Sequence, residues 1–407
     1  MTETYKKLLA VVRCQLFGGE KPQLNDSELS AILKEAEAQT VLMTVFPLLR
    51  DKLKTADPAK FAVISEKFFG GVMNNTANFL EHDELHRLMT ENGIPYCALK
   101  GLASAYYYPE ASVREMGDVD FLVEEKDFAA AKQLVLSAGF AVDHGEGEDD
   151  IHIAFKREPR SIWEQHRGVN GIPSGEAGER IKAELAQTIA TAELVTLDGA
   201  TCLIPDKFHH GLIMLLHMIS HMTSEGIGLR HLCDWAVFAN AIWSGEFSAL
   251  FEEKLKSFGL WKFAQIMTLC AEKYLGIRRK EWAQNSSVTE GQLEAVMEDI
   301  LGGGNFGKKD MNRYREIKYI SNRGDRTVDD KNVFAQLFST LNQKVYSDYA
   351  FIKNHKVFLP AGWVAEGGKY VGLLLTGQRK SKDTAKMLAE ASKRKEIYSQ
   401  MALFQSE

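Results

Sequence analysis

The chain has 407 residues, enough for two or three domains, and its 45% hydrophobic and 26% charged residues are ordinary for a soluble globular protein. A formal net charge of −6 and a pI near 6.1 exclude a general basic field, so we expect small substrates rather than general nucleic-acid binding. The five cysteines show no C-x-x-C spacing and no apolar run reaches the roughly 18 residues of a membrane span, which predicts a cytoplasmic chain with reduced thiols.

The first 92 residues have a helical pattern throughout. Helix starts are indicated at residues 25–27 and 57–58, where Asp can cap a helix and Pro58 can occupy its first turn. We therefore expect an N-terminal helical region over residues 1–92.

The next region, residues 93–204, is predicted to contain short strands. The apolar run 94–99 is typical of a strand, and Gly101 is expected to open a helix directly after it. A strand, a glycine turn and a helix N-terminus form a cradle for phosphate, because free backbone N–H groups and the helix dipole face the anion. Lys100 lies in this turn and could add a positive charge.

Residues 117–123 read Gly-Asp-Val-Asp-Phe-Leu-Val, which places Asp118 and Asp120 two residues apart at the start of a second strand. Side chains alternate along a strand, so both carboxylates share one face while Val119 and Phe121 point into the opposite layer. Two like charges side by side are costly unless a cation lies between them. The pair is therefore either a solvated strand end or a Mg²⁺ site for chemistry on phosphate groups.

Four short motifs resemble those of a known family. They are Leu99-Lys100-Gly101, Tyr108-Pro109, Arg114 and Gly117-Asp118-Val119-Asp120-Phe121-Leu122-Val123. This pattern is similar to that of the uncharacterised nucleotidyltransferase family of the DNA polymerase beta superfamily. The superfamily has a small-residue turn after its first strand, paired acids on the second strand and a third carboxylate on a later one. Leu102 stands where the turn usually has its second small residue.

The resemblance implies a role for each matched residue. Asp118 and Asp120 would hold the metal ion, and Lys100 and Gly101 would contact the triphosphate of the donor. Arg114 lies four residues before the first Asp, in the loop expected to run over the nucleotide. Its planar guanidinium suits phosphate oxygens, although a solvated loop Arg is the alternative.

The third carboxylate is expected where an apolar stretch resumes. The run 161–166, Ser-Ile-Trp-Glu-Gln-His, fits a strand after the extended run 151–155, and Glu164 matches the acid of the family's apolar-Glu-x-His pattern. His166 shares a strand face with Glu164 and is a candidate substrate contact. The resemblance implies that Glu164 completes the metal site and accepts the proton of the attacking hydroxyl, whereas the residues alone favour a surface Glu beside a surface His.

Two further elements are predicted in the 93–204 region. The pattern indicates a helix from about residue 126 to 138, ended by Gly139. Asp198-Gly199 marks a hairpin turn between two short strands. These elements, with the strands above, indicate a small mixed sheet.

Residues 205–300 return to a helical period and begin with a strongly apolar helix. His217 and His221 share a helix face at a spacing that suits two metal ligands, but the Glu of an H-E-x-x-H zinc motif is absent. Structural or substrate-contacting histidines are therefore favoured over zinc ligands. Arg230 and Asp234 stand one helical turn apart and could pair. The family has a similar His, Arg and Asp pattern, which implies a helical domain that faces the acceptor substrate.

The glycine-rich run 302–307 predicts a loop or linker over residues 301–331, followed by a mostly helical region over residues 332–407. Its consecutive glycines could suggest a phosphate loop, but no Lys-Ser or Lys-Thr completes a Walker pattern. Basic residues between 379 and 395 alternate with apolar ones, which is typical of an exposed C-terminal helix and also suits a membrane surface or RNA.

The sequence thus predicts an α+β protein whose small mixed β-sheet, the nucleotidyltransferase core, is flanked by N-terminal and C-terminal helical regions. The expected reaction is the transfer of a nucleoside monophosphate from an NTP, ATP by preference, to a hydroxyl of a small molecule, peptide or protein, with Mg²⁺ or Mn²⁺. Two alternatives stay open: a nucleotide-binding or interaction module without turnover, and a kinase-like phosphotransferase that releases ADP. The oligomeric state is not predicted.

Overall fold

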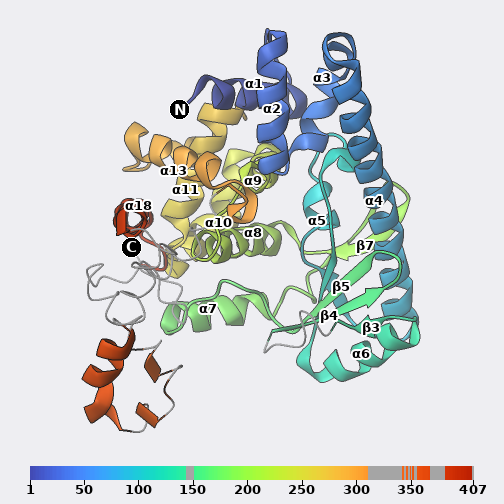
Figure 1. The fold of residues 1–407 in the computed structure, drawn as a ribbon. Coiled ribbons are helices and arrows are strands. Elements are labelled where there is room, and N and C mark those ends of the chain that lie inside the picture. The colour runs from blue at the N-terminus through green and yellow to red at the C-terminus, as the bar shows by residue number, and fades with distance from the viewer. Residues whose placement is uncertain are drawn as a thin grey trace.

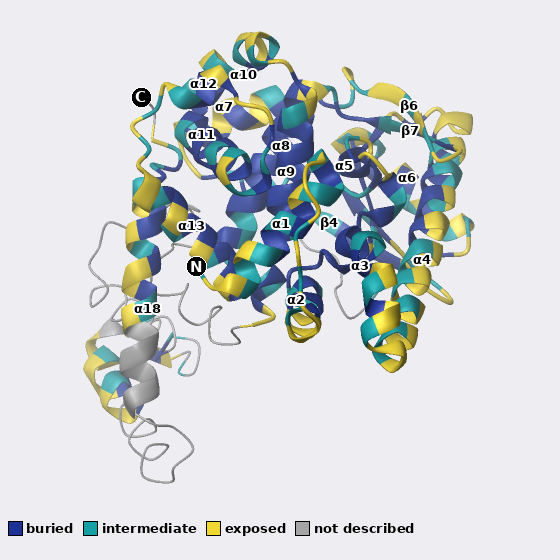
Figure 2. Cartoon of the chain, turned by 90° about the horizontal axis from the view of Figure 1, so that it is seen from above, coloured by how far each residue is buried: buried dark blue, intermediate teal, exposed yellow. Residues whose placement is uncertain are grey.

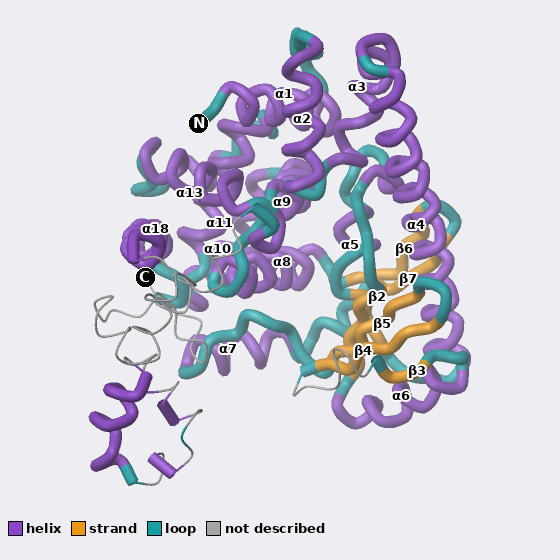
Figure 3. The backbone as a smooth tube through the Cα atoms, in the orientation of Figure 1, coloured by secondary structure: helices purple, strands orange, loops and turns teal. Residues whose placement is uncertain are grey.

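The computed structural model describes residues 1–143, 151–309, 342, 345–346, 349, 351–352, 355–366 and 381–405. These residues combine many helices with a five-stranded and a two-stranded sheet (Figures 1 and 3). The predicted α+β class, with a small mixed sheet flanked by helices, is confirmed. In this part of the chain, no helix combines the length and apolar character that a membrane span requires.

Four helices precede the main sheet. They are α1 (Glu3–Phe17), α2 (Asp26–Ala38), α3 (Leu42–Ala56) and α4 (Pro58–Glu91). Asn25 and Glu28 form a capping box at the start of α2, and Asp57 caps α4 with Pro58 in its first turn. Both predicted helix starts are therefore confirmed. The long helix α4 runs beside the strands (Figure 3).

The main sheet has the strand order β1-β2-β5-β4-β3. In that order the strands are β1 (Tyr96–Ala98), β2 (Val119–Val123), β5 (Ser161–His166), β4 (His152–Arg157) and β3 (Ala141–Val142). β2 and β5 run parallel, and the other neighbours in this sheet pair antiparallel. The parallel register sets Asp120 opposite Glu164 and Leu122 opposite His166.

The two faces of the main sheet have different partners. Val119 and Phe121 belong to an apolar core that also includes residues of α4 and of α6 (Phe128–Ser137). Leu122 belongs instead to the larger core built by the helices. Because side chains alternate along β2, Asp120 lies on the same face as Leu122, opposite the core that contains residues of α4 and α6.

Two predicted turns are confirmed, one at Gly139 and one at Asp198-Gly199. α6 ends directly before Ala138, and Gly139 follows with a φ of +89° that favours glycine. The strands β6 (Glu193–Leu197) and β7 (Ala200–Ile204) form the two-stranded sheet. Between them, Asp198 and Gly199 have φ of +48° and +84°, as a two-residue hairpin turn of this hand requires.

Helices build the rest of the described structure. They are α5 (Leu102–Ala105), α7 (Glu176–Leu185), α8 (Lys207–Met222), α9 (Leu229–Ala241), α10 (Ser244–Phe258), α11 (Trp261–Cys270) with the π-helical turn Ala271–Leu275, α12 (Glu281–Gln284) and α13 (Glu290–Gly303). α8 and α9 are buried along most of their length (Figure 2). They form the helical wall that faces the main sheet.

The segment expected as a linker begins inside a helix, because residues 301–303 are the last turn of α13. Asn305–Gly307 then form a short 3₁₀ turn with Asn305 buried. The structure does not describe residues 310–331 or most of 332–380, which include the basic positions 379–380. Helix α18 (Ser381–Gln400) packs against α13, where Arg394 and Tyr398 hydrogen-bond to Asp299.

Close packing of α8 against its neighbours requires a glycine at position 211. A Cβ atom there would lie 2.6 Å from a ring carbon of Phe251 and 3.0 Å from one of Phe238. We expect Gly211→Ala to lower the free energy of unfolding by about 1–3 kcal/mol, because the rings must move. Gly291→Ala is the control, because a Cβ there meets no atom within 4 Å in an exposed first turn of α13. Urea denaturation that finds both variants equally stable would contradict this packing.

Candidate active site

One cavity of about 800 Å³ lies between the main sheet and the helical wall of α8 and α9. Ten of the eleven residues predicted as site residues line this cavity. From the sheet and its loops come Lys100, Gly101, Arg114, Asp118, Asp120 and Glu164, and from α8 and α9 come His217, His221, Arg230 and Asp234. The eleventh, His166, lies behind the carboxylates and is buried. The fold therefore brings together residues that are more than 100 positions apart in the sequence.

Asp120 is the buried centre of the carboxylate group. Its Oδ1 accepts hydrogen bonds from Lys100 Nζ at 2.8 Å and from His166 Nε2 at 2.9 Å. Burial alone would raise the pKa of Asp120, but the charge of Lys100 and the hydrogen bond from His166 outweigh it and hold the pKa well below its ordinary value. Asp120 is therefore ionised and fixed in orientation.

His166 joins two of the acids. Its Nε2 lies 2.9 Å from Asp120 Oδ1 and 3.3 Å from Glu164 Oε2. Burial disfavours the charged imidazolium, yet the hydrogen bonds with Asp120 and Glu164 raise the pKa of His166 above its ordinary value. One oxygen or nitrogen atom from each of these three residues lies within 4.8 Å of the others. His166 thus positions the two carboxylates from behind the cavity wall.

Asp118 stands two residues before Asp120, at the entrance to β2. The negative charge of Asp120, together with burial, raises the pKa of Asp118 to about 6, although Lys100 acts in the opposite direction. The ionised carboxylate of Asp120 therefore disfavours a second negative charge on Asp118. A bound cation would remove that repulsion, because it would supply the opposite charge to both acids.

The donor set fits a hard divalent cation. Asp118, Asp120 and Glu164 offer carboxylate oxygens, the ligands that Mg²⁺ prefers. Lys100 Nζ lies in ion-pair contact with Asp120, and His166 lies against Asp120 and Glu164. Even with both of these side chains charged, three carboxylates leave a negative balance that a divalent ion would neutralise. Mn²⁺ accepts the same oxygen ligands.

Helix α4 holds the loop that leads to the acids. Asn75 Nδ2 donates to the carbonyl oxygens of Ser112 and Arg114, both at 2.7 Å. Asn75 Oδ1 accepts from the Met116 N–H at 3.2 Å. One buried asparagine therefore fixes three backbone groups of this loop.

Asn78 and His82 continue the same row on α4. Asn78 Nδ2 donates to the Asp118 carbonyl oxygen at 3.2 Å, and the Asn78 carbonyl lies 2.8 Å from His82 Nδ1. Burial lowers the pKa of His82 to about 4, so its ring is neutral. Sequence reasoning missed this row. The available signal was the spacing of polar residues at 75, 78 and 82, which places them on one helix face.

Arg114 does not extend over the cavity as a free cation. Its Nε and Nη2 donate to Oδ1 and Oδ2 of Asp234, each at 2.8 Å, and the Tyr108 hydroxyl donates to the same Oδ1 at 2.8 Å. The expected pairing of Asp234 with Arg230 is wrong in the structure, because the planar fork of Arg114 engages both oxygens of this carboxylate. The pair ties the loop before β2 to α9.

The glycine turn expected as a phosphate cradle is present but small. Gly101 has a φ of +54° and caps α5, which has four residues. A helix of one turn carries little dipole, so the contribution of α5 to anion binding is weak. Gly101 nevertheless lines the cavity beside Asp118 and Lys100.

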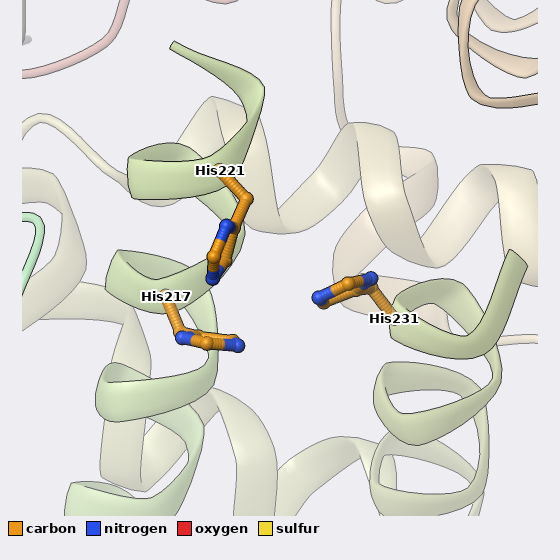
Figure 4. A group of neighbouring side chains, drawn as sticks. All are labelled: His217, His221 and His231. Atoms are coloured by element: carbon orange, nitrogen blue, oxygen red, sulfur yellow. The ribbon is translucent and has the colours of Figure 1, made fainter. Parts of the chain in front are cut away.

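Three histidines gather on the helical wall. His217 and His221 come from α8 and His231 from α9 (Figure 4). The ring centroids of His217 and His221 are 4.4 Å apart, and those of His217 and His231 are 5.5 Å apart. The sequence indicated the first two by their spacing. His231 was missed, because it joins them only through the packing of α9 against α8.

A family model described as "Uncharacterised nucleotidyltransferase" matches residues 25–276, more than half of the chain. The matched range includes the carboxylate group and both helices of the opposite wall. Among curated proteins, none is similar enough to this chain to count as a relative.

The buried pair between Arg114 and Asp234 predicts a large effect on stability. Asp234→Ala leaves the guanidinium of Arg114 buried without its partner, so we expect the free energy of unfolding to fall by about 3–5 kcal/mol. The matched control is Asp51→Ala, which removes the partner of Arg50 in an exposed pair and should cost less than about 1 kcal/mol. Urea denaturation compares the two variants. Similar losses in both would show that the buried pair does not hold the loop to α9.

Proposed function

Because the chain belongs to the uncharacterised nucleotidyltransferase family, we propose that it transfers a nucleoside monophosphate from an NTP, ATP by preference, to a hydroxyl group of an acceptor. Asp118, Asp120 and Glu164 would hold Mg²⁺ or Mn²⁺. The strongest support is the parallel register of β2 and β5, which sets Asp120 opposite Glu164. These acids line a cavity whose volume, about 800 Å³, is in the range of ligand sites.

In the proposed reaction, the acceptor oxygen attacks the α-phosphorus and the bond from that phosphorus to the bridging oxygen of the β-phosphate breaks. Pyrophosphate leaves with the bonding electrons. Glu164 accepts the hydroxyl proton, since its carboxylate is partly open to the cavity. When bound, a divalent cation would neutralise the charge on the phosphate oxygens.

Several side chains would position this chemistry without reacting. Lys100 and His166 fix the orientation of Asp120, and Asn78 fixes the backbone at Asp118. Groups held in place before the substrate arrives need little reorganisation during the reaction. Lys100 and Gly101 also stay proposed contacts to the triphosphate, because both line the cavity beside the acids.

We assign Arg114 a positioning role rather than a direct contact to phosphate. Its Nε and one terminal nitrogen already donate to Asp234. A hydrogen-bonded, buried ion pair resists replacement, because breaking it leaves an unpaired charge. Arg114 would then keep the loop before β2 in register with α9.

Asp120→Asn tests the proposed function. We expect the rate of pyrophosphate release from an NTP with Mg²⁺ to fall by roughly 10²–10⁴-fold, because the variant loses a charged metal ligand. The amide keeps the shape of the side chain, but Lys100 and His166 lose their anionic partner, so the thermal midpoint should fall. Rates are therefore compared at a temperature at which the variant is folded. The measurement is pyrophosphate release with each of the four NTPs and a panel of hydroxyl acceptors.

Asp26→Asn is the matched control, because Asp26 is an exposed residue of α2 that does not line the cavity. It should release pyrophosphate as fast as the wild type. Full activity in Asp120→Asn would remove the central role of the carboxylates. ADP in place of pyrophosphate would identify a phosphotransferase, and nucleotide binding without any product would identify a binding module.

A further inference from the structure

The wall of the cavity opposite the carboxylates carries positive charge and N–H donors. Arg230 and His231 lie in the first turn of α9, and His217 lies beside them on α8. All three line the cavity. The first turn of α9 contains no acidic residue, although helix N-termini favour negative charge. A cationic side chain at that end is unfavourable unless an anion lies nearby.

The guanidinium of Arg230 has donors that no described residue uses. One terminal nitrogen donates to the Glu115 carbonyl oxygen at 3.2 Å, while Nε is buried without a hydrogen-bond partner. Two acids whose charges act on Arg230 are engaged elsewhere. Asp234 is held by Arg114, and the Glu115 carboxylate accepts from the Met43 N–H at 3.3 Å.

His231 presents a second donor to the same space. The Gly228 N–H donates to its Nδ1 at 3.4 Å, which leaves the proton of the neutral ring on Nε2. His231 is 3% exposed, and its Nε2 has no hydrogen-bond partner among the described residues. The ring points toward His217 and His221 (Figure 4). A buried N–H without an acceptor is costly, and an oxygen atom of a ligand would satisfy it.

The three histidines also have the spacing of metal ligands, with one nitrogen from each within 4.8 Å of the others. Two observations favour an anion over a cation. A ligating nitrogen must be unprotonated, whereas Nε2 of His231 carries the proton. The cations Lys100 and Arg230 line the same cavity as His217, and together with burial, which is the largest cause, they lower the pKa of His217 well below its ordinary value. Those charges repel a metal ion and attract a phosphate.

We propose that Arg230, His231 and His217 form a subsite for the β- and γ-phosphate groups of the nucleotide, across the cavity from the carboxylates. This inference rests on the proposed function and names the part of the site that holds the leaving group. Arg230 and Asp118 line the same cavity of about 800 Å³, so one polyphosphate chain can reach both walls. The α-phosphate then lies at the carboxylates and the departing pyrophosphate lies at Arg230.

The subsite would also act on the rate. As the bond between the α-phosphorus and the bridging oxygen breaks, negative charge grows on the pyrophosphate. Arg230 and the Nε2–H of His231 would donate to those oxygens more strongly as their charge grows. Donors placed where charge develops lower the barrier of the step.

Binding of inorganic pyrophosphate to the full chain tests the subsite without turnover. Isothermal titration is performed in EDTA, so that the carboxylates hold no metal ion. We expect the wild type to bind pyrophosphate and Arg230→Gln to bind it roughly 10–100-fold more weakly, because charge-assisted hydrogen bonds are lost. Arg230→Lys keeps the charge without the fork, so its affinity should fall between these two.

Two controls separate the subsite from general effects. Arg180→Gln removes an exposed arginine of α7 and should bind pyrophosphate as the wild type does. AMP lacks the β- and γ-phosphates, so its affinity should not change in Arg230→Gln, whereas the affinity for ATP should fall. Thermal midpoints establish that each variant is folded, and Arg230→Lys decides the question should the glutamine variant unfold.

The outcomes distinguish the subsite from the proposed function. The subsite is overturned by a wild type that fails to bind pyrophosphate, or by equal pyrophosphate affinity in Arg230→Gln. It is also overturned by one Zn²⁺ retained per chain that His217→Ala loses, since the histidines would then be metal ligands. Pyrophosphate binding that needs Arg230, in a protein that never transfers a nucleotide, would support an anion site and overturn the nucleotidyl transfer.

Discussion

A buried carboxylate must be compensated, and the compensation of Asp120 organises the sheet side of this protein. Lys100 follows β1, Asp120 lies on β2 and His166 ends β5, so one ion-paired group joins three strands. An isolated charge at this depth would be very costly, whereas this carboxylate accepts hydrogen bonds from two cationic or polar donors. The same contacts direct Asp120 and Glu164 toward the cavity. Structural necessity and candidate chemistry therefore depend on the same atoms.

A second buried pair joins the two halves of the cavity. Arg114 precedes β2 and Asp234 lies on α9, and their bidentate contact keeps the helical wall opposite the sheet. The two walls of the cavity between them carry different groups. The sheet wall carries three carboxylates beside Lys100, and the helical wall carries Arg230 and three histidines beside the paired Asp234. A nucleotide polyphosphate with its divalent ion has the matching distribution of charge.

Local patterns predicted the elements that depend on local physics. The spacing of Asp118 and Asp120, the strand 161–166 with Glu164 and the turn at Asp198-Gly199 all follow from the two-residue period of strands or from backbone conformation. The partner of Asp234 could not be predicted in this way. Arg230 is one helical turn from Asp234, yet Arg114, 120 residues distant in the sequence, reaches both of its oxygens.

The sequence by itself determined the α+β class, the family and the residue types of the carboxylate group, because these depend on periodicity and on short motifs. Tertiary structure alone decided that Asn75 and Asn78 hold the loop before β2, that His231 joins His217, and that Arg230 keeps unused donors. Each of these facts depends on which elements pack together. Packing is set by the sum of many contacts across the chain, so no local window of sequence contains it.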